Sequence, residues 1–281
     1  MNKIPIIVWG FRYNASSGGT MVLHKLCHML REMGEEAYMW IAELNLGPGA
    51  LSPAYNTPMA NGKVDPKKCV VIYPEIVTDN PLKAKVVVRW ILYTPGGFGP
   101  LVVPASNDFV FYYEQHFWPQ GETLNHLRVF EPRLDKFNFT SDATIRSGGC
   151  FINRKGSKKP RIPETNNCLE LYHTGIDYEI SIFRSKEVFY SYDTTTVASL
   201  HAAICGCLSI IIPEDGLTAD EFRKRVPLFR YGVAYGLSED EINYAKRTQH
   251  LVKDYLRYIE LEGYRHVEVL LHKLEKARNT L

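Results

Sequence analysis

A carboxylate and three hydroxyl groups follow an apolar run, at the place where the sequence predicts the start of a helix. The side chains are Asp193, Thr194, Thr195 and Thr196, and Tyr192 precedes them. The first backbone N–H groups of a helix lack intrahelical partners, and the helix dipole favours an anion there by about 0.3–1 kcal/mol. The pattern therefore indicates a phosphate-bearing ligand. The same residues can also serve only as a helix cap, and that alternative stays open.

A histidine extends this pattern along the predicted helix. His201 follows Asp193 with seven residues between them, so the two side chains are expected near one helical face, slightly over two turns apart. Ala202, Ala203 and Gly206 come next and allow the helix to pack closely on a sheet. A buried strand is expected over residues 208–212.

This arrangement resembles the donor-binding segment of GT-B glycosyltransferases, which use nucleotide sugars. Many retaining members of that family carry two glutamates at this separation, then alanine and a Gly-x-Pro-Val-type strand. The resemblance implies that Asp193 faces the donor sugar and that His201 holds the ribose hydroxyls. His201 departs from the family's glutamate, although an imidazole can also hydrogen-bond a ribose. The resemblance is strongest over residues 148–213.

The resemblance implies an α/β fold with two Rossmann-like domains that face each other across a cleft, followed by C-terminal helices. Residues 1–138 are expected to bind the acceptor. Residues 139–281 are expected to bind the nucleotide-sugar donor, with the last helix packing back on the first domain. Independently, strand patterns that alternate with helical patterns indicate parallel sheets covered on both faces. The expected strands are residues 4–9, 37–42, 69–73, 86–93, 108–113, 149–153, 168–172, 188–192 and 208–212.

Helices are expected where apolar residues recur at helical spacing. One begins after Gly18-Gly19, carries an apolar stripe from Val22 to Met33 and ends at Gly34. Short helices are expected after Asn80-Pro81 and around residues 178–184. A long helical region is expected over residues 238–277, with Gly263 dividing it in two.

A cluster of basic residues follows the strand expected over residues 149–153. Arg154, Lys155 and Lys158 are the members that could clamp a diphosphate, at roughly 1.5–3 kcal/mol for each shielded charge-assisted bond. A solvated surface loop is the competing interpretation. GT-B enzymes often carry an Arg and a Lys at this loop, so the resemblance favours donor binding.

Two further loops are candidates for donor contact. Thr174 and Gly175 end the strand expected over residues 168–172, at the edge that surrounds the nucleobase in the family. Gly18 and Gly19 open the first helix, where the family's glycine-rich loop approaches phosphates or acceptor. A double glycine is also required by a tight strand-to-helix turn, and it is not a G-x-G-x-x-G fingerprint.

Glycosyl transfer needs help at the acceptor hydroxyl, and an inverting enzyme requires a general base there. Glu75 and Asp79 follow a first-domain strand and are the preferred catalytic carboxylates. Glu114 and His116 are the second choice. Asp79 could instead cap the helix expected after it.

No Asp-x-Asp pattern occurs, so no metal cofactor is expected, and cationic groups and backbone amides would neutralise the leaving nucleotide. The resemblance implies a nucleotide-sugar donor, with UDP favoured as the commonest nucleotide, and an oligosaccharide or glycan acceptor. The function expected is therefore metal-independent glycosyl transfer in glycan biosynthesis.

The composition of the chain limits its expected partners and location. The net charge is +2, which argues against a nucleic-acid surface, so no nucleic-acid partner is expected. No signal peptide or transmembrane segment is visible, and six cysteines without paired metal spacing indicate reduced thiols. The chain is expected to be cytoplasmic and a monomer or weak homodimer. Two rivals stay open: another nucleotide-sugar or Rossmann enzyme, and a non-catalytic nucleotide- or glycan-binding module.

Overall fold

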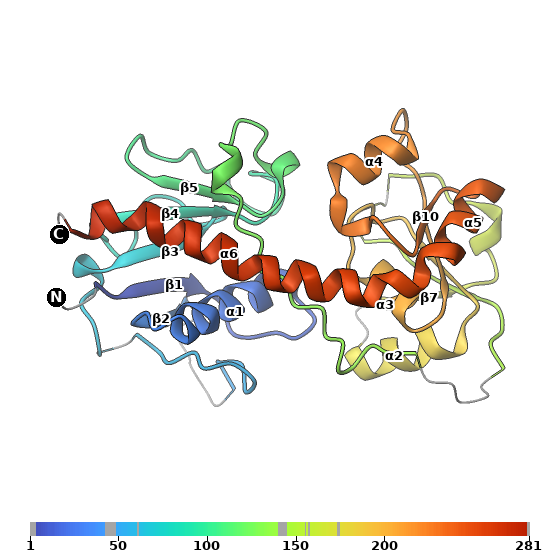
Figure 1. Cartoon of the computed structure of the whole chain (residues 1–281), viewed down its shortest axis with the longest axis horizontal. Coiled ribbons are helices and arrows are strands. Elements are labelled where there is room, and N and C mark those ends of the chain that lie inside the picture. The colour runs from blue at the N-terminus through green and yellow to red at the C-terminus, as the bar shows by residue number, and fades with distance from the viewer. Residues whose placement is uncertain are drawn as a thin grey trace. The chain divides into compact units, whose positions relative to one another are not determined.

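The computed structural model describes residues 4–42, 49–60, 62–139, 145–154, 156, 158–172 and 175–279. The chain divides into two compact units (Figure 1). Unit 1 comprises Met1–Glu131 and Glu260–Leu281, and unit 2 comprises Pro132–Ile259. The first boundary between the units lies after Glu131, whereas the sequence predicts it after residue 138. The C-terminal segment from Glu260 onward belongs to unit 1.

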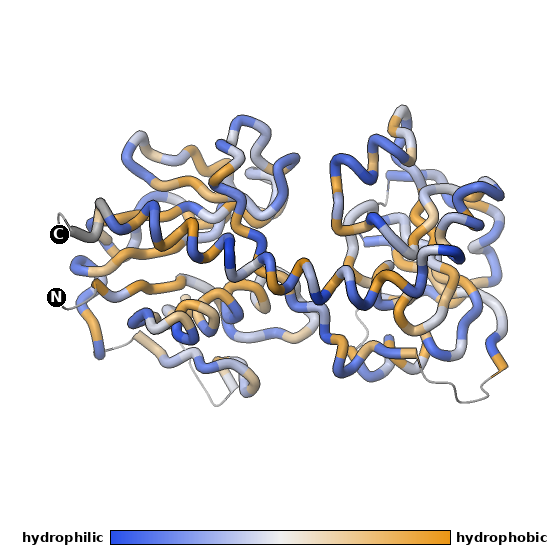
Figure 2. Tube along the Cα trace, in the orientation of Figure 1, coloured by the Kyte–Doolittle hydropathy of each residue, from blue (hydrophilic) through white to orange (hydrophobic). Residues whose placement is uncertain are grey.

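Unit 1 contains a five-stranded parallel sheet in the order β2-β1-β3-β4-β5. Its strands are β1 (Ile6–Gly10), β2 (Ala37–Ile41), β3 (Val70–Pro74), β4 (Val86–Ile91) and β5 (Phe109–Tyr112). Every residue of the central strands β3 and β4 is buried, because segments of the chain cover both faces of the sheet. Runs of valine and isoleucine are what such doubly covered strands require. Figure 2 shows that apolar residues run along the strands of this unit.

Two helices cover one face of this sheet: α1 (Gly18–Glu32) and α6 (Val252–Asn279). Leu26 and Leu30 of α1 join Val267, Leu270 and Leu274 of α6 in one buried cluster with the strands. The opposite face carries a smaller cluster around Tyr73, in which side chains of β1, β3 and β4 pack against connecting segments. Three 3₁₀ helices complete the unit: η1 (Pro66–Lys68), η2 (Gln115–Phe117) and η3 (Thr123–Asn125).

Unit 2 repeats the same plan with the order β10-β9-β8-β6-β7, again all parallel. Its strands are β6 (Gly149–Ile152), β7 (Leu169–Glu170), β8 (Val188–Ser191), β9 (Leu208–Ile211) and β10 (Val233–Tyr235). Its helices are α2 (Ile176–Ser185), α3 (Ala198–Ile204), α4 (Ala219–Arg225) and α5 (Glu239–Thr248), with the 3₁₀ helices η4 (Pro163–Thr165), η5 (Pro227–Phe229) and η6 (Gln249–Leu251). The prediction of an α/β fold with two Rossmann-like domains is confirmed.

The strand order defines one special position in each sheet. In unit 1 the chain passes from β1 outward to β2 and then returns to the other side of β1 as β3. In unit 2 it does the same from β6 through β7 to β8. Connections therefore leave these neighbouring strands in opposite directions, and the carboxyl ends of the strands at such a position are where open α/β sheets bind ligands. We call these positions the β1/β3 and β6/β8 switch points.

Two helix predictions are wrong. The helix expected from Thr194 begins only at Ala198, because residues 194–197 form turns, so the threonines do not stand at its first N–H groups. The helix expected after Asn80-Pro81 does not form. The Asn80 amide instead closes a turn on itself, accepting from Ala84 N at 2.9 Å and donating to Ala84 O at 2.7 Å. Such local bonds compete with helix formation.

Gly263 does not divide the C-terminal region. The break falls at η6, between α5 and α6, and Gly263 lies inside α6. A Cβ atom there would stand 3.0 Å from the Arg128 carbonyl oxygen, so glycine permits the helix to approach that backbone closely. None of the helices in the described part of the chain combines the length and hydropathy needed to span a bilayer. All six cysteines are free thiols.

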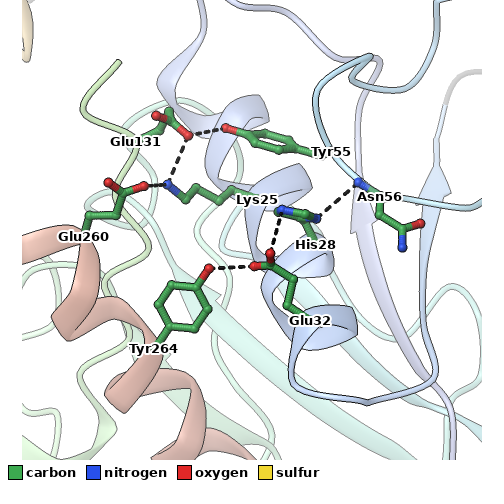
Figure 3. A network of polar contacts seen from close by, with 8 residues as sticks. All are labelled: Lys25, His28, Glu32, Tyr55, Asn56, Glu131, Glu260 and Tyr264. Atoms are coloured by element: carbon green, nitrogen blue, oxygen red, sulfur yellow. Dashed lines mark hydrogen bonds and ion pairs between the residues drawn. The ribbon is translucent and has the colours of Figure 1, made fainter. Parts of the chain in front are cut away.

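A buried lysine holds together the two chain segments that join the units. Lys25 of α1 is 4% exposed, and its Nζ lies 3.0 Å from Glu131 Oε2 and 2.5 Å from Glu260 Oε1 (Figure 3). Glu131 is the last residue of unit 1 before the chain enters unit 2, and Glu260 is the first after its return. Tyr55 donates a further hydrogen bond to Glu131 at 2.6 Å. Lys25 thus ties both crossing points to α1.

A second set of contacts extends this network along α1 and α6. Tyr264 of α6 donates to Glu32 Oε2 at 2.6 Å, and Glu32 Oε1 lies 3.5 Å from His28 Nε2. The other ring nitrogen of His28 accepts from the Asn56 backbone at 3.2 Å. Three separate segments of unit 1 are therefore connected by polar contacts (Figure 3).

Replacing Lys25 with methionine is expected to lower the free energy of unfolding by on the order of 2 kcal/mol. Removing one partner of a fully buried ion pair costs about 3–5 kcal/mol, and Glu131 and Glu260 can recover part of this because they reach solvent. Urea unfolding measures the loss. Lys273→Met is the matched control, since Lys273 pairs with the exposed Glu122 and should lose less than about 1 kcal/mol. Equal losses of unfolding free energy in both variants would contradict the conclusion that the buried contacts of Lys25 stabilise the fold more than a surface ion pair does.

Candidate functional site

The β6/β8 switch point of unit 2 is built around Asp193, the first residue of the predicted donor motif. Asp193 follows β8 and is 1% exposed. Its Oδ1 accepts hydrogen bonds from two backbone N–H groups of the loop after β6: Arg154 at 2.9 Å and Gly156 at 3.0 Å. The Arg154 guanidinium Nε lies 3.7 Å from Asp193 Oδ2. The carboxylate thereby folds the basic loop over the carboxyl end of the sheet.

Gly156 is required by this folding. A Cβ atom at Gly156 would lie 2.0 Å from the Tyr192 carbonyl oxygen, a contact that only a backbone shift could relieve. The loop can approach β8 closely enough to reach Asp193 only because the side chain is absent. Sequence reasoning missed Gly156, although a glycine inside a basic loop at a strand end is the available signal.

Lys159, rather than Lys158, reaches the end of the sheet. Its Nζ donates to Thr194 Oγ1 at 2.8 Å and to the Ile212 carbonyl oxygen, directly after β9, at 2.6 Å. Lys158 is exposed. Burial lowers the pKa of Lys159, and the carboxylates of Glu214, Asp193 and Asp215 act in the opposite direction. Sequence reasoning did not single out Lys159, because side-chain type alone does not separate neighbouring lysines.

Replacing Lys159 with methionine is expected to weaken UDP binding about 10- to 100-fold, the loss of one shielded charge-assisted contact to phosphate. Lys158→Met is the matched control and is expected to change affinity by less than about twofold, because an exposed lysine is screened by water and salt. Isothermal titration with UDP measures both. A larger loss of UDP affinity in Lys158→Met than in Lys159→Met would show that Lys158, the residue expected from the sequence, contacts the phosphate.

The remaining residues of the predicted motif divide into surface and core. Thr194 and Thr195 are half-buried, and Thr196 is buried with its carbonyl accepting from Ser199 at the start of α3. Tyr192 is fully buried, and its hydroxyl contacts the Ile162 N–H and the Thr165 hydroxyl within unit 2. Tyr192 therefore supports the loop from the core and is not open to a donor.

His201 does not lie where a ribose could reach it. Its ring stacks on Phe137 at a centroid distance of 3.7 Å and an interplanar angle of 7°. Burial lowers the pKa of the imidazole to about 3, and the positive charge of Arg133 acts in the same direction. The expected ribose contact is therefore corrected: His201 is a neutral core side chain at physiological pH.

Two predicted donor residues, Lys155 and Thr174, lie outside the described residues. Gly175 forms the N-cap of α2 and has open space around it. Asp177 and Glu179 occupy the first turn of α2, and their charges already complement the helix dipole there. This helix start is consequently a poor place for a phosphate.

Gly18 and Gly19 lie on the β1 side of the β1/β3 switch point, at the start of the 15-residue helix α1. A Cβ atom on either glycine would meet nothing within 4 Å, so packing does not require glycine there. Ser17 caps α1 by accepting from the Thr20 N–H, and no acidic residue occupies its first turn. The surface is open and favours an anion more than the start of α2 does.

Glu75 lies on the other side of this switch point, directly after β3. It is 6% exposed, and its Oε2 accepts from the Leu92 N–H at 3.0 Å. Burial raises the pKa of Glu75, and the backbone N–H groups of Leu92, Glu75 and Tyr93 oppose this only in part. A buried carboxyl with a raised pKa at the edge of a sheet has the properties of a general base.

The other predicted carboxylates fit that role less well. Asp79 is exposed and has a left-handed backbone conformation with φ of 55°, and its carbonyl accepts from Arg89. No helix follows for it to cap. Glu114 is buried against Arg128 at 2.6 Å, and burial raises its pKa. His116, the other second choice, follows it in η2. Glu75 is therefore the preferred base.

Among the described residues, no three His, Cys, Asp or Glu side chains gather closely enough to hold a metal ion. Of the residues that the structure describes at the β6/β8 switch point, Arg154 and Lys159 carry the positive charge. The expectation of metal-independent chemistry stays a prediction that chelation can test.

Comparison with solved structures finds several glycosyltransferases. An α-glucosyltransferase in complex with UDP and a 13-mer DNA is 10% identical, with 95% of each chain covered and a TM-score of 0.47. T4 phage β-glucosyltransferase is 12% identical, covering 98% of this chain and 99% of its own, with a TM-score of 0.48. AviGT4, from avilamycin A biosynthesis, is 13% identical, covering 94% and 98%, with a TM-score of 0.39.

No family model matches the chain, and no curated protein matches it. Two of the similar structures contain DNA with a modified base. The expectation that nucleic acid is excluded as a partner is therefore corrected: near-neutral net charge does not support that exclusion.

Proposed function

We propose that this protein is a glycosyltransferase that moves a sugar from a nucleotide-diphosphate sugar, with UDP favoured, to an acceptor hydroxyl without a metal ion. The observation that carries the proposal is the basic loop of unit 2. Asp193 holds it over the β6/β8 switch point, beside the ammonium group of Lys159. A topological switch point that carries cationic groups is the place where this kind of sheet binds phosphates.

In this proposal unit 2 holds the donor. Arg154 and Lys159 contact the diphosphate, and the Thr194 hydroxyl lies beside Lys159 at the same edge. Asp193 positions the loop and does not itself contact the sugar, because it is buried and binds backbone N–H groups. Positive charge that is fixed before the reaction stabilises the negative charge that develops on the leaving diphosphate.

Unit 1 supplies the acceptor side of the reaction. Glu75 removes the proton from the acceptor hydroxyl, whose oxygen forms the new bond to the anomeric carbon. The bond from that carbon to the diphosphate oxygen breaks, and its electron pair leaves with the nucleoside diphosphate. Gly18 and Gly19 leave open backbone at the same switch point, where a substrate group can approach. The glycan predicted from the sequence remains one candidate acceptor.

A non-catalytic binding module is the second candidate, and one observation favours it: the family's second acidic position is the buried, neutral His201. Thermal shift measurements with UDP-, GDP- and ADP-sugars and with NAD separate the possibilities. The proposal expects stabilisation by one nucleotide sugar together with slow donor hydrolysis or transfer. Binding without turnover would favour the module, and stabilisation by NAD alone would favour a Rossmann oxidoreductase.

Removing divalent cations is expected to leave the activity unchanged. Arg154 and Lys159 supply positive charge at the proposed diphosphate position, and no cluster of metal-ligating side chains occurs in the described ranges. The measurement is donor hydrolysis and transfer before and after treatment with EDTA. A loss of activity that Mg²⁺ or Mn²⁺ restores would contradict the metal-free mechanism.

A further inference from the structure

The loop between β4 and β5 exposes apolar side chains at the carboxyl edge of unit 1. Residues 93–107 include no charged side chain. Three of them are large, apolar and exposed: Phe98 at 65%, Leu101 at 70% and Val103 at 79%. Large apolar side chains that are exposed together in one loop are candidates for a surface that binds a ligand.

Buried contacts at its base hold this loop in place. Arg89 of β4 is 4% exposed, and its Nε contacts Asp108 Oδ2 at 2.9 Å. The same carboxylate oxygen accepts from the Ala105 N–H at 3.1 Å. The guanidinium also donates to the carbonyl oxygens of Val77 and Asp79, which belong to the loop after Glu75. One arginine therefore fixes the apolar loop and the base-bearing loop relative to each other.

A row of rings connects the apolar loop with Glu75. The Phe98 ring lies 4.7 Å from the Tyr93 ring, which lies 5.1 Å from Phe117. The Tyr93 N–H is one of the backbone groups that bind the Glu75 carboxylate. A Cβ atom at Gly97 would stand 2.8 Å from the Tyr93 ring, so the loop packs directly on that ring. Tyr93 therefore contacts both the exposed Phe98 ring, through its own ring, and the Glu75 carboxylate, through its N–H.

We infer that the loop of residues 93–107 is the acceptor subsite, and that the acceptor carries its reactive hydroxyl on or next to an uncharged planar ring. This inference rests on the proposed function. Phe98 stacks on the ring, Leu101 and Val103 cover its apolar surroundings, and the hydroxyl lies toward Glu75. Offset stacking of aromatic rings is worth about 0.5–1.5 kcal/mol beyond the area buried.

The chemistry of the loop disfavours a polar oligosaccharide as the group that contacts it. Such an acceptor needs hydrogen-bonding partners for many hydroxyl groups, whereas the exposed side chains of Leu101 and Val103 offer only carbon. An uncharged ring with one hydroxyl or hydroxymethyl group fits this restriction, whether the ring is free or part of a larger molecule.

The test uses the full chain, the nucleotide sugar selected by thermal shift, and two acceptors: benzyl alcohol and maltotriose. The variants are Phe98→Ser and Leu101→Ser, with Leu261→Ser as the control, because Leu261 is an equally exposed leucine on α6. Thermal midpoints identify any variant that fails to fold. Donor affinity and donor hydrolysis by water are measured beside transfer.

Transfer to benzyl alcohol is expected, with the acceptor KM raised about tenfold or more in Phe98→Ser and Leu101→Ser. Donor affinity and hydrolysis should stay within about twofold of the parent in both, and Leu261→Ser should match the parent throughout. Transfer to maltotriose alone, or an unchanged KM in folded Phe98→Ser, would overturn the inference and leave the proposed function standing. Absence of donor binding and hydrolysis in the parent would overturn both.

Discussion

Replacing Gly156 with alanine is expected to weaken UDP binding by about 10- to 100-fold, the loss of a shielded charge-assisted contact between Arg154 and phosphate. The new methyl group would be built 2.0 Å from the Tyr192 carbonyl oxygen. The loop must move away, and it would then lose the hydrogen bonds from Arg154 N and Gly156 N to Asp193. The Arg154 side chain would be displaced with them.

Titration with UDP measures this loss, and urea unfolding separates it from general destabilisation, which we expect to be about 1–3 kcal/mol. Gly19→Ala is the control for stability, since a Cβ atom there meets nothing within 4 Å and lies in a helix. That variant should be as stable as the parent or slightly more stable. Parental UDP affinity in Gly156→Ala would show that the loop does not bind the donor.

Replacing Glu75 with glutamine is expected to lower kcat about 10²- to 10⁴-fold while donor affinity stays within twofold, because the amide cannot accept the acceptor proton. Burial raises the pKa of Glu75, so the acid limb of the parent's kcat/KM profile should lie above the ordinary glutamate value of 4.5. Steady-state kinetics across pH measures both effects. Asp79→Asn is the matched control, with an expected change of less than about threefold. The opposite pattern would identify Asp79 as the base.

The same carboxyl group gives a stability prediction with a definite sign. A folded-state pKa above the unfolded value means that the folded state binds this proton more tightly. The contribution of Glu75 to stability is therefore greatest below the unfolded pKa, and it is lost as pH rises through the folded pKa. Urea unfolding of Glu75→Gln should lack this decrease. A parallel pH dependence in the parent and the variant would contradict the assignment of the shift to Glu75.

The strands were predictable because buried parallel strands require unbroken apolar runs. β3 and β4 were recognisable from Val70–Pro74 and Val86–Ile91, which are buried throughout. β10 was missed because Val233–Tyr235 is too short a run to stand out. The start of α3 was misplaced because the threonines near Asp193 have the composition of a helix cap. Here they form turns, beside a carboxylate that binds backbone N–H groups 37 and 39 residues away.

The position of the candidate site could be predicted better than its individual residues. Strand ends and switch points follow from the order of elements, and this placed Asp193, Arg154 and Glu75 at sheet edges. The choice of Lys159 over Lys158 depends on which side chain reaches Ile212 across the sheet, and no local pattern encodes that contact. His201 was misassigned for the same reason, since its stacking partner Phe137 precedes it by 64 residues.

Helix α6 belongs to unit 1 from Glu260 onward although it comes at the end of the sequence, and this has a consequence for folding during synthesis. Val267, Leu270 and Leu274 complete the core of unit 1, yet the ribosome adds them only after all of Pro132–Ile259 has been made. Unit 2 is therefore fully synthesised while the N-terminal sheet still exposes the apolar surface that α6 will cover. The half that is translated first can therefore complete its core only after the other half has been synthesised, and until then it exposes the kind of apolar surface that chaperones bind.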